Sequence, residues 1–359
     1  MAFDISRRFY EICHYVCFAL VLCNVLYRHL FYIAVMLLCY VGVWIYKRSQ
    51  NTWMDINGQG ILITGCDTGF GFHAVERFHD LGYTIIAGVL NMESKGAQKL
   101  RKKKSKRLHI VKLDVTSDTD VMEAVKYIQS KRLGLWGVVS NAGINFPGDV
   151  ELTTTDQFQK VAEVNLYGGI RVIKGCLPLV RRSKGRVVVI SSARGLYSWP
   201  GESAYNITKH GIETMADCLR LEMRKFGVKV VVVQPGDFDG ATSIMSPIQL
   251  ERIKQEFGTM WENASDEVRS TYGKEYLDNM YQARSTKMID ITPVSPDPIT
   301  DAIQQALFRS TPFSRYFVGG TDGYVDIVGV YAKLFNILPE SVTDKFAEWW
   351  TDCHHFSNK

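Results

Sequence analysis

Residues 60–71 of the chain read GILITGCDTGFG, a short β-branched run that passes into a glycine-rich turn. A helical pattern then continues through Leu81. Strand, glycine-rich turn and helix in this order is the context in which a turn binds phosphate, because glycines let the backbone approach a pyrophosphate at the helix N-terminus. The pattern Thr64-Gly65-x-x-x-Gly69-x-Gly71 is spaced differently from the GxGxxG fingerprint. We therefore expect this stretch to open a dinucleotide-binding domain.

Further apolar runs alternate with helical patterns along the chain. They comprise residues 83–90, 109–115, 136–143 and 186–192. Strands that alternate with helices predict a parallel sheet with helices on both faces. With 359 residues, 46% of them hydrophobic and 22% charged, the chain can bury one large α/β domain. The expected fold class is α/β, with a single Rossmann-like, doubly wound parallel sheet.

The residues after the second run bear on the choice between NAD and NADP. In this architecture that position meets the adenosine ribose, where an acid favours NAD and an arginine favours NADP. The run ends at Leu90-Asn91, which supplies neither. Lys95 and Lys99 follow, and we expect them to face solvent on the next helix. Asp114 lies at the end of the third run, where we expect it near the adenine.

A serine, a tyrosine and a lysine form the candidate catalytic set. Ser192 ends a buried run, Tyr205 follows thirteen residues later, and Lys209 lies four residues beyond. Positions i and i+4 share one face of a helix, so the phenol and the ammonium can point into the same cleft. An adjacent ammonium and a positive nicotinamide ring lower the pKa of a phenol, about 10 when free. Tyr205 can then exchange the hydroxyl proton, while Ser192 hydrogen-bonds the reacting oxygen.

Two more roles complete this catalytic hypothesis. Lys209 would also hold the nicotinamide ribose, and Asn165, in the segment EVNLYG, could hold the water that carries the proton to solvent. A tyrosine four residues before a lysine is common on surface helices by chance. Here a strand-end serine, an NAG turn at 141–143 and the glycine-rich turn all precede it. Chance explains this conjunction poorly.

TGCDTGFG, SNAG, ISS and YNITK, in this order, resemble the short-chain dehydrogenase/reductase family across residues 57–320. TGCDTGFG is similar to the subgroup of retinol, 17β- and 11β-hydroxysteroid and D-β-hydroxybutyrate dehydrogenases, and VAEVNLYG and GVKVVVVQPGDF look most like the last of these. The resemblance implies NAD as cofactor, with NADP as the alternative. It implies a cofactor site made of Thr64, Gly65, Asp67, Gly69, Phe70, Gly71, Asp114, Val115, Asn141, Ala142, Gly143, Tyr205, Lys209, Pro235 and Gly236.

The expected substrate wall departs from this resemblance at Glu202, three residues before the tyrosine of the catalytic set. The hydroxybutyrate enzymes that the chain resembles carry a basic residue there, which suits a carboxylate, whereas a second carboxylate repels one. Arg194 could supply the missing cation, or it could be a solvated loop residue. Tyr197 and Trp199 indicate an apolar wall.

These residues leave three functional hypotheses. We expect a lipophilic alcohol or ketone, steroid- or retinoid-like, bound at Ser192, Arg194 and Glu202. A ketone-body enzyme acting on D-3-hydroxybutyrate is the alternative. A non-catalytic nucleotide-binding scaffold would need a damaged serine–tyrosine–lysine set, and this set is intact.

The N-terminal residues 1–52 differ from the rest and predict a membrane anchor. Residues 9–27 are apolar except for three polar side chains, and residues 30–46 carry no charge. These lengths fit one transmembrane helix or a helical hairpin. Lys47 and Arg48 place the following domain on the cytosolic side if the membrane is that of the endoplasmic reticulum. A mitochondrial membrane is the alternative.

The rest of the chain divides into a catalytic domain at 53–320, which contains a helical substrate lid at 246–292, and a helical tail at 321–359. In the tail, the apolar run at 325–338 is too short to span a bilayer. It can be a packed helix or a shallow membrane contact.

The composition of the chain argues against two kinds of partner, a metal ion and nucleic acid. Eight cysteines without a CxxC pair argue against a zinc site, so we expect no metal. The basic run at 101–107 has no base-reading element beside it, so we expect no nucleic-acid partner. A small-molecule alcohol or ketone, membrane lipid and a second copy of the chain remain.

Overall fold

The computed structural model describes residues 2–49, 51–242, 247–289, 294–320, 327–335 and 337–354. It divides into two compact units, Met1–Trp53 and Met54–Lys359. The first unit is one long helix, α1 (Ala2–Ser49), which passes through Arg28 and His29 without interruption. Of the two predicted forms, a helix or a hairpin, the structure therefore has the single helix.

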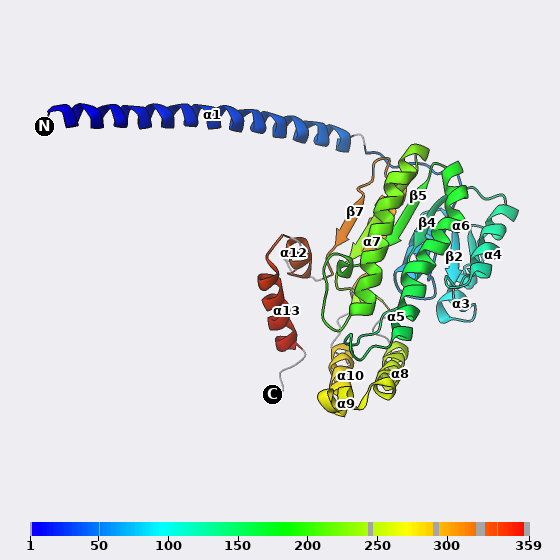
Figure 1. Ribbon diagram of the computed structural model, residues 1–359. Helices are drawn as coiled ribbons and strands as arrows, with labels where there is room; N and C mark the ends of the chain where they lie inside the picture. The colour runs from blue at the N-terminus through cyan, green and yellow to red at the C-terminus, as the bar shows by residue number, and fades with distance from the viewer. Residues whose placement is uncertain are drawn as a thin grey trace. The chain divides into compact units, whose positions relative to one another are not determined.

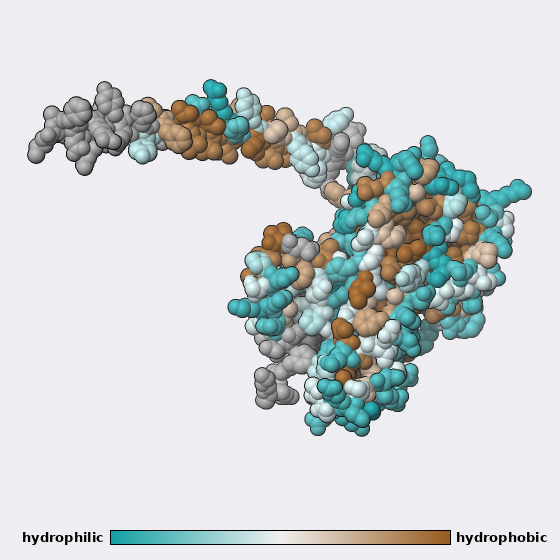
Figure 2. Space-filling model, in the orientation of Figure 1, coloured by the Kyte–Doolittle hydropathy of each residue, from teal (hydrophilic) through white to brown (hydrophobic). Residues whose placement is uncertain are grey.

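The middle of α1 has the length and composition of a membrane span. The stretch Tyr15–Tyr46 is long and apolar enough to cross a bilayer. Its described side chains are exposed, and many of them are large and apolar, as Figure 2 shows. Nothing in the described part of this unit covers them, which is typical of a helix that meets lipid or another apolar surface.

The second unit is built on a seven-stranded sheet in which every described pairing is parallel (Figure 1). The spatial order is β3-β2-β1-β4-β5-β6-β7. The strands are β1 (Gly60–Ile63), β2 (Thr84–Val89), β3 (Leu108–Lys112), β4 (Leu135–Ser140), β5 (Arg186–Ile190), β6 (Lys229–Pro235) and β7 (Arg315–Val318). The chain leaves β1 in one direction and returns to its other side at β4, so the topological switch point lies between these strands.

Helices cover both faces of this sheet, which confirms the doubly wound α/β prediction. One face packs against α2 (Gly69–Asp80), α3 (Lys95–Lys102) and α11 (Asp297–Phe308). The other packs against α4 (Asp118–Ser130), α6 (Gly169–Arg182) and α7 (Ser203–Met223). Strands covered on both faces read as continuous apolar runs, which explains the valines of β5 and β6.

Shorter helices position the site. A helix α5 (Thr155–Ala162) runs through a π-helical turn, η1 (Glu163–Gly168), into α6. A single 3-10 turn, η2 (Ala193–Gly195), follows β5, and two more are η3 (Arg224–Phe226) and η4 (Asp239–Ala241). The predicted lid forms α8 (Pro247–Asn263), α9 (Asp266–Tyr272) and α10 (Lys274–Ile289). Its residues 246 and 290–292 lie outside the described residues.

The lid and the tail each have a core of their own. The lid packs with α5 and the loop after β4 through Phe146, Leu152 and Phe257. The tail forms α12 (Ile327–Leu334) and α13 (Glu340–His354), and Tyr331 and Phe346 pack with Tyr197 beside η2. The predicted helix at 325–338 is thus a packed helix in its described part, although its apolar side chains Val330, Leu334 and Ile337 are exposed.

Candidate active site

The glycine-rich turn places main-chain atoms where a phosphate can approach. Gly65 has φ +69°, a backbone conformation that side-chain-bearing residues rarely adopt. A Cβ on Gly71 would lie 2.4 Å from the carbonyl oxygen of Gly65, so only glycine allows α2 to pack against the turn. The first turn of α2 contains no acid, and Thr68 before it makes no side-chain cap bond. The backbone N–H groups in the first turn of α2 can therefore bind a pyrophosphate.

A threonine and an asparagine fasten the ends of β1 and β4 together. Thr64 Oγ1 accepts hydrogen bonds from the backbone N–H groups of Asn141 and Ala142, each at 3.0 Å. Asn141 Nδ2 donates to the carbonyl oxygen of Thr64 at 2.8 Å and to that of Gly65 at 3.3 Å. The two loops that flank the switch point are thereby held in one geometry.

One large cavity of about 1190 Å³ runs along the carboxyl ends of the strands. Most of the expected cofactor residues line it, namely Gly65, Asp67, Gly69, Phe70, Asp114, Val115, Asn141, Ala142, Gly143, Tyr205, Lys209, Pro235 and Gly236. Thr64 and Gly71 do not line it. Thr64 bonds to the loop after β4, and Gly71 packs closely against Gly65 of the turn. The sequence-predicted set is therefore brought together in one place.

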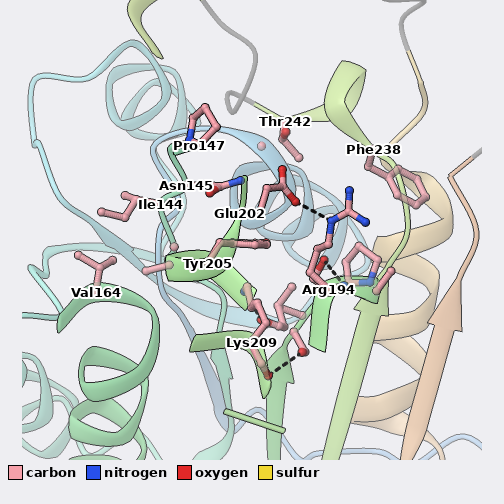
Figure 3. Close-up of a pocket in the computed structure, with 18 of the residues that line it drawn as sticks. Ile144, Asn145, Pro147, Val164, Arg194, Glu202, Tyr205, Lys209, Phe238 and Thr242 are labelled. Carbon is pink, nitrogen blue, oxygen red and sulfur yellow. Dashed lines mark hydrogen bonds and ion pairs between the residues drawn. The ribbon is translucent and has the colours of Figure 1, made fainter. Parts of the chain in front are cut away.

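The three side chains of the candidate catalytic set line this cavity, and Figure 3 shows two of them, Tyr205 and Lys209. Ser192 follows β5, and its hydroxyl accepts a hydrogen bond from the backbone N–H of Arg194 at 3.2 Å. Tyr205 and Lys209 both project from α7, with Lys209 Nζ 5.3 Å from the centre of the tyrosine ring. Lys209 Nζ donates to the carbonyl oxygen of Ile190 at 3.0 Å. The ammonium of Lys209 therefore lies over the ring of Tyr205, on the helix face that the i, i+4 spacing predicted.

Burial sets the charge behaviour of Lys209. The side chain is removed from water, which lowers the pKa of its ammonium to about 8, and the nearby carboxylate of Glu213 opposes this only in part. At neutral pH the ammonium is therefore still charged, next to Tyr205. A second tyrosine in the cavity, Tyr197, is an unsuitable base because burial raises its pKa to about 12.

Asn165 lies in the π-helical turn and does not line the cavity. Its Nδ2 donates to the carbonyl oxygen of Ile144 at 2.9 Å and to Thr208 Oγ1 at 3.2 Å, while its Oδ1 accepts from the N–H of Ile144 at 2.8 Å. These bonds occupy both amide hydrogens, so the side chain joins the loop after β4 to α7. The water-holding role remains a prediction.

The end of the cavity where the substrate is predicted to bind contains a half-buried ion cluster that joins three segments. Arg194 Nε donates to Glu202 Oε2 at 2.6 Å, and Arg284 Nη2, from α10, donates to Glu202 Oε1 at 3.3 Å. Burial alone would raise the pKa of Glu202, but the two guanidinium charges outweigh burial and lower it. Glu202 is thus not an unpaired acid, and Arg194 is a half-buried residue of the cavity wall that is held in an ion pair.

Aromatic rings surround the same arginine. The Arg194 guanidinium lies 5.0 Å from the ring centres of both Tyr197 and Trp199, and its Nη1 donates to the Tyr197 hydroxyl. Tyr331 packs edge-on against Tyr197 at 5.0 Å, and Phe346 stacks on Tyr331 at 4.7 Å. Tyr197 and Trp199 thus belong to an aromatic wall of the cavity, to which the tail adds Tyr331 and Phe346. That this wall binds the substrate stays a prediction.

Sequence reasoning missed three residues of this wall, Arg284, Tyr331 and Phe346. They come from the lid and the tail, far along the chain from Tyr205. One signal could have pointed to Arg284: a glutamate three residues before the catalytic tyrosine needs a cation when it is buried. No comparable sequence signal marks Tyr331 or Phe346.

A phosphate-binding turn at the switch point, with a serine, tyrosine and lysine beyond it, defines a nicotinamide-nucleotide oxidoreductase. Residues 59–252 match the family model for short chain dehydrogenase. The chain therefore belongs to the short-chain dehydrogenase family, whose members act on CH–OH groups with a nicotinamide cofactor.

Named relatives cover most of the chain. The mitochondrial D-beta-hydroxybutyrate dehydrogenase of Mus musculus is 42% identical over 278 residues, which cover 75% of this chain and 80% of that protein. Retinol dehydrogenase 7 of Rattus norvegicus is 35% identical, covering 79% of this chain and 88% of that protein. The 11-beta-hydroxysteroid dehydrogenase type 2 of Homo sapiens is 33% identical, and the match covers 82% of this chain and 71% of that protein. The predicted subgroup is confirmed.

Solved structures share the fold at lower identity. A short-chain dehydrogenase from Streptomyces avermitilis matches with a TM-score of 0.60 at 24% identity, over 82% of this chain and 97% of that one. A short chain dehydrogenase from Burkholderia cenocepacia, in complex with NADP, matches with a TM-score of 0.59 at 17% identity, over 81% and 98%. Both support the fold alone.

Proposed function

We propose that the chain is an NAD-dependent dehydrogenase that interconverts a lipophilic alcohol and its carbonyl compound at Ser192, Tyr205 and Lys209. The observation that carries this proposal is the meeting of these three side chains in one cavity with the phosphate-binding turn. The intact set argues against a non-catalytic scaffold.

The residues divide the chemistry between them. Tyr205 takes the hydroxyl proton in oxidation and returns it in reduction. The Lys209 ammonium beside it favours the phenolate. Ser192 hydrogen-bonds the reacting oxygen, and Lys209 also holds the nicotinamide ribose. The nicotinamide ring, when bound, accepts or returns the hydride.

The charge balance at the substrate end supports a lipophilic substrate. Two cations, Arg194 and Arg284, both form ion pairs with Glu202. A second carboxylate, Asp237, also interacts electrostatically with Arg194. The charges of these four groups balance, and burying an unpaired carboxylate is costly. Lys160 and Arg252 also line the cavity, and Lys160 is paired with Glu256. An apolar substrate gains about 0.8 kcal/mol for each buried CH₂ without a charged partner.

The test is a comparison of specificity constants with NAD. We expect a hydroxysteroid or retinol to give a higher kcat/KM than D-3-hydroxybutyrate by at least about tenfold, which corresponds to about 1.4 kcal/mol of binding to the transition state. A preference for hydroxybutyrate would contradict the lipophilic substrate while leaving the dehydrogenase itself in place.

A hydroxy acid is the second candidate, because one observation favours it. Arg284 lines the cavity, and its bond to Glu202 uses one of its five N–H donors. The remaining donors can bind a carboxylate. If hydroxybutyrate is the substrate, Arg284→Met should raise its KM at least about tenfold, since a charge-assisted pair is lost. Lys254→Met, which removes an exposed cation from α8, should leave KM unchanged.

Membrane attachment is the third part of the proposal. The exposed apolar helix from Tyr15 to Tyr46 supports an anchor at 1–52, followed by the catalytic domain at 53–320 and the tail at 321–359. Lys47 and Arg48 favour a cytosolic catalytic domain at the endoplasmic reticulum, with a mitochondrial membrane as the alternative. A second copy of the chain stays a predicted partner.

Carbonate extraction tests the anchor. The full chain should stay in the membrane pellet at alkaline pH, and a chain starting at residue 52 should be released. Release of the full chain would contradict the anchor. A truncated chain that still pellets would implicate the exposed apolar side chains of α12 and α13.

A further inference from the structure

An acidic side chain from the phosphate-binding turn lies at the end of β2. The two oxygens of Asp67 accept hydrogen bonds from successive backbone N–H groups, Oδ2 from Leu90 at 2.8 Å and Oδ1 from Asn91 at 3.1 Å. Asp67, Leu90 and Asn91 all line the cavity. The carboxylate therefore occupies, in space, the position where doubly wound folds usually place an acid from the end of the second strand.

This carboxylate has acceptor capacity to spare. An ionised carboxylate offers about four lone-pair sites, and the two backbone bonds use two of them. Asp67 is only partly buried, so the remaining sites are open to the cavity. Two neighbouring acceptors on one rigidly held group match the two adjacent hydroxyls of a ribose.

No cation lines the cavity beside Asp67 among the residues that the structure describes, so a phosphate would find none there. Among the described residues that line this end of the cavity, the charged ones are Asp67 and Asp114. Lys99, the cation that the sequence offers nearby, is 3.2 Å from Glu76 and lies over the ring of Phe72. Lys95 is exposed and is not a lining residue. A 2′-phosphate would thus face two carboxylates.

We propose that Asp67 sets the preference for NAD over NADP, by accepting the adenosine ribose hydroxyls and repelling a 2′-phosphate. This inference rests on the proposed nicotinamide cofactor and names the residue that discriminates between its two forms. The discriminating acid comes from the phosphate-binding turn, and the end of β2 contributes only the two N–H groups that orient it.

The test is the ratio of kcat/KM for NAD to that for NADP. In Asp67→Asn the charge is lost while one backbone bond can remain, so the ratio should fall at least about tenfold, mainly through the two KM values. Glu123→Gln, which removes an exposed carboxylate from α4, is the charge-matched control and should leave the ratio unchanged. A ratio in Asp67→Asn within about twofold of wild type, or an equal loss with both cofactors, would overturn the proposal.

A second measurement needs no variant and stands if Asp67→Asn does not fold. Salt screens like-charge repulsion, since the Debye length falls from about 10 Å at 0.1 M to about 3 Å at 1 M. Contacts common to both cofactors cancel in the ratio of their dissociation constants. The ratio of Kd for NADPH to that for NADH should therefore shrink at least about threefold over this range. A ratio that stays constant overturns the role of Asp67, whereas failure of the wild type to bind either cofactor overturns the proposed function instead.

Discussion

At the cofactor end of the cavity, main-chain atoms form most of the site, whereas at the substrate end charged and aromatic side chains from distant segments form it. The turn at 64–71 and the loop at 141–143 are joined by hydrogen bonds that the side chains of Thr64 and Asn141 make with backbone groups, and by close glycine contacts. Arg194, Glu202 and Arg284 meet instead through their side chains. The first kind of site depends on backbone geometry and tolerates little change, and the second can be rebuilt by changing side chains.

The largest expected effect tests the atoms where the two ends meet. Tyr205→Phe removes the proton acceptor and keeps the ring, so kcat should fall about 10³-fold or more. The Kd for NADH should stay within about twofold, as fluorescence titration would measure. Substantial remaining turnover would mean that Tyr205 is not the acid–base group.

Removing the negative charge of Glu202, at the centre of the ion cluster, should destabilise the substrate end. Glu202→Gln removes the carboxylate that pairs both Arg194 and Arg284 in a half-buried cluster, and the cost should lie below the value of about 3 kcal/mol for a fully buried pair. Thermal unfolding should shift to lower temperature by several degrees. Affinity for NADH should change little, because the cofactor end does not use this carboxylate.

A parallel loss of NADH affinity in Glu202→Gln would show that the two ends are not separable. An unchanged melting temperature would show that water already screens the cluster. Arg284→Met removes only the link to the lid, so it should destabilise the protein less.

One added methyl group at the cofactor end should weaken NADH binding. Gly71→Ala puts a Cβ 2.4 Å from the Gly65 carbonyl oxygen, and overpacking of this kind costs about 1–3 kcal/mol. We expect the Kd for NADH to rise at least about tenfold. Gly258→Ala is the matched control, because a Cβ there meets nothing within 4 Å in α8, and the replacement should stabilise the helix slightly.

The smallest expected effect is a pH dependence that Lys209 gives to cofactor binding. Its ammonium has a pKa of about 8, so the charge is present below this pH and lost above it. Affinity for NADH should be constant near pH 7 and should fall by up to about tenfold as pH rises through 8. In Lys209→Met the profile should be flat.

The free energy of unfolding should change with pH in the opposite direction to the affinity for NADH, because of the same lysine. Its pKa is about 8 in the folded protein and 10.5 for an unperturbed lysine, so the unfolded chain binds more protons between these values. The free energy of unfolding due to Lys209 therefore rises with pH over this range. A fall in urea-unfolding stability over this range that Lys209→Met abolishes would contradict the depressed pKa.

Prediction from sequence succeeded where the backbone carries the structure. The order of strands and helices, the turn at 64–71 and the pair Tyr205–Lys209 all depend on local periodicity and spacing, which a sequence contains. Glu202 could not be interpreted in the same way. Its environment is set by Arg284, which lies 82 residues further along the chain, and no local rule connects the two.

Asp67 shows the same limit on a smaller scale. The sequence rule looks for an acid directly after the second strand, and Leu90-Asn91 does not supply one. The carboxylate reaches that place from 23 residues earlier in the chain, because β1 and β2 are adjacent in the parallel sheet. Only the pairing of the strands reveals it.

The hydroxyl of Thr64 has a consequence for how a cofactor is bound. It joins the loops after β1 and β4 through bonds within the protein itself, so these loops are held in one conformation before a ligand arrives. Binding then loses little conformational entropy there, and more of the interaction energy appears as affinity. We expect Thr64→Ser to be tolerated and Thr64→Val to be damaging, because an isosteric methyl group would leave two part-buried backbone N–H groups without this acceptor.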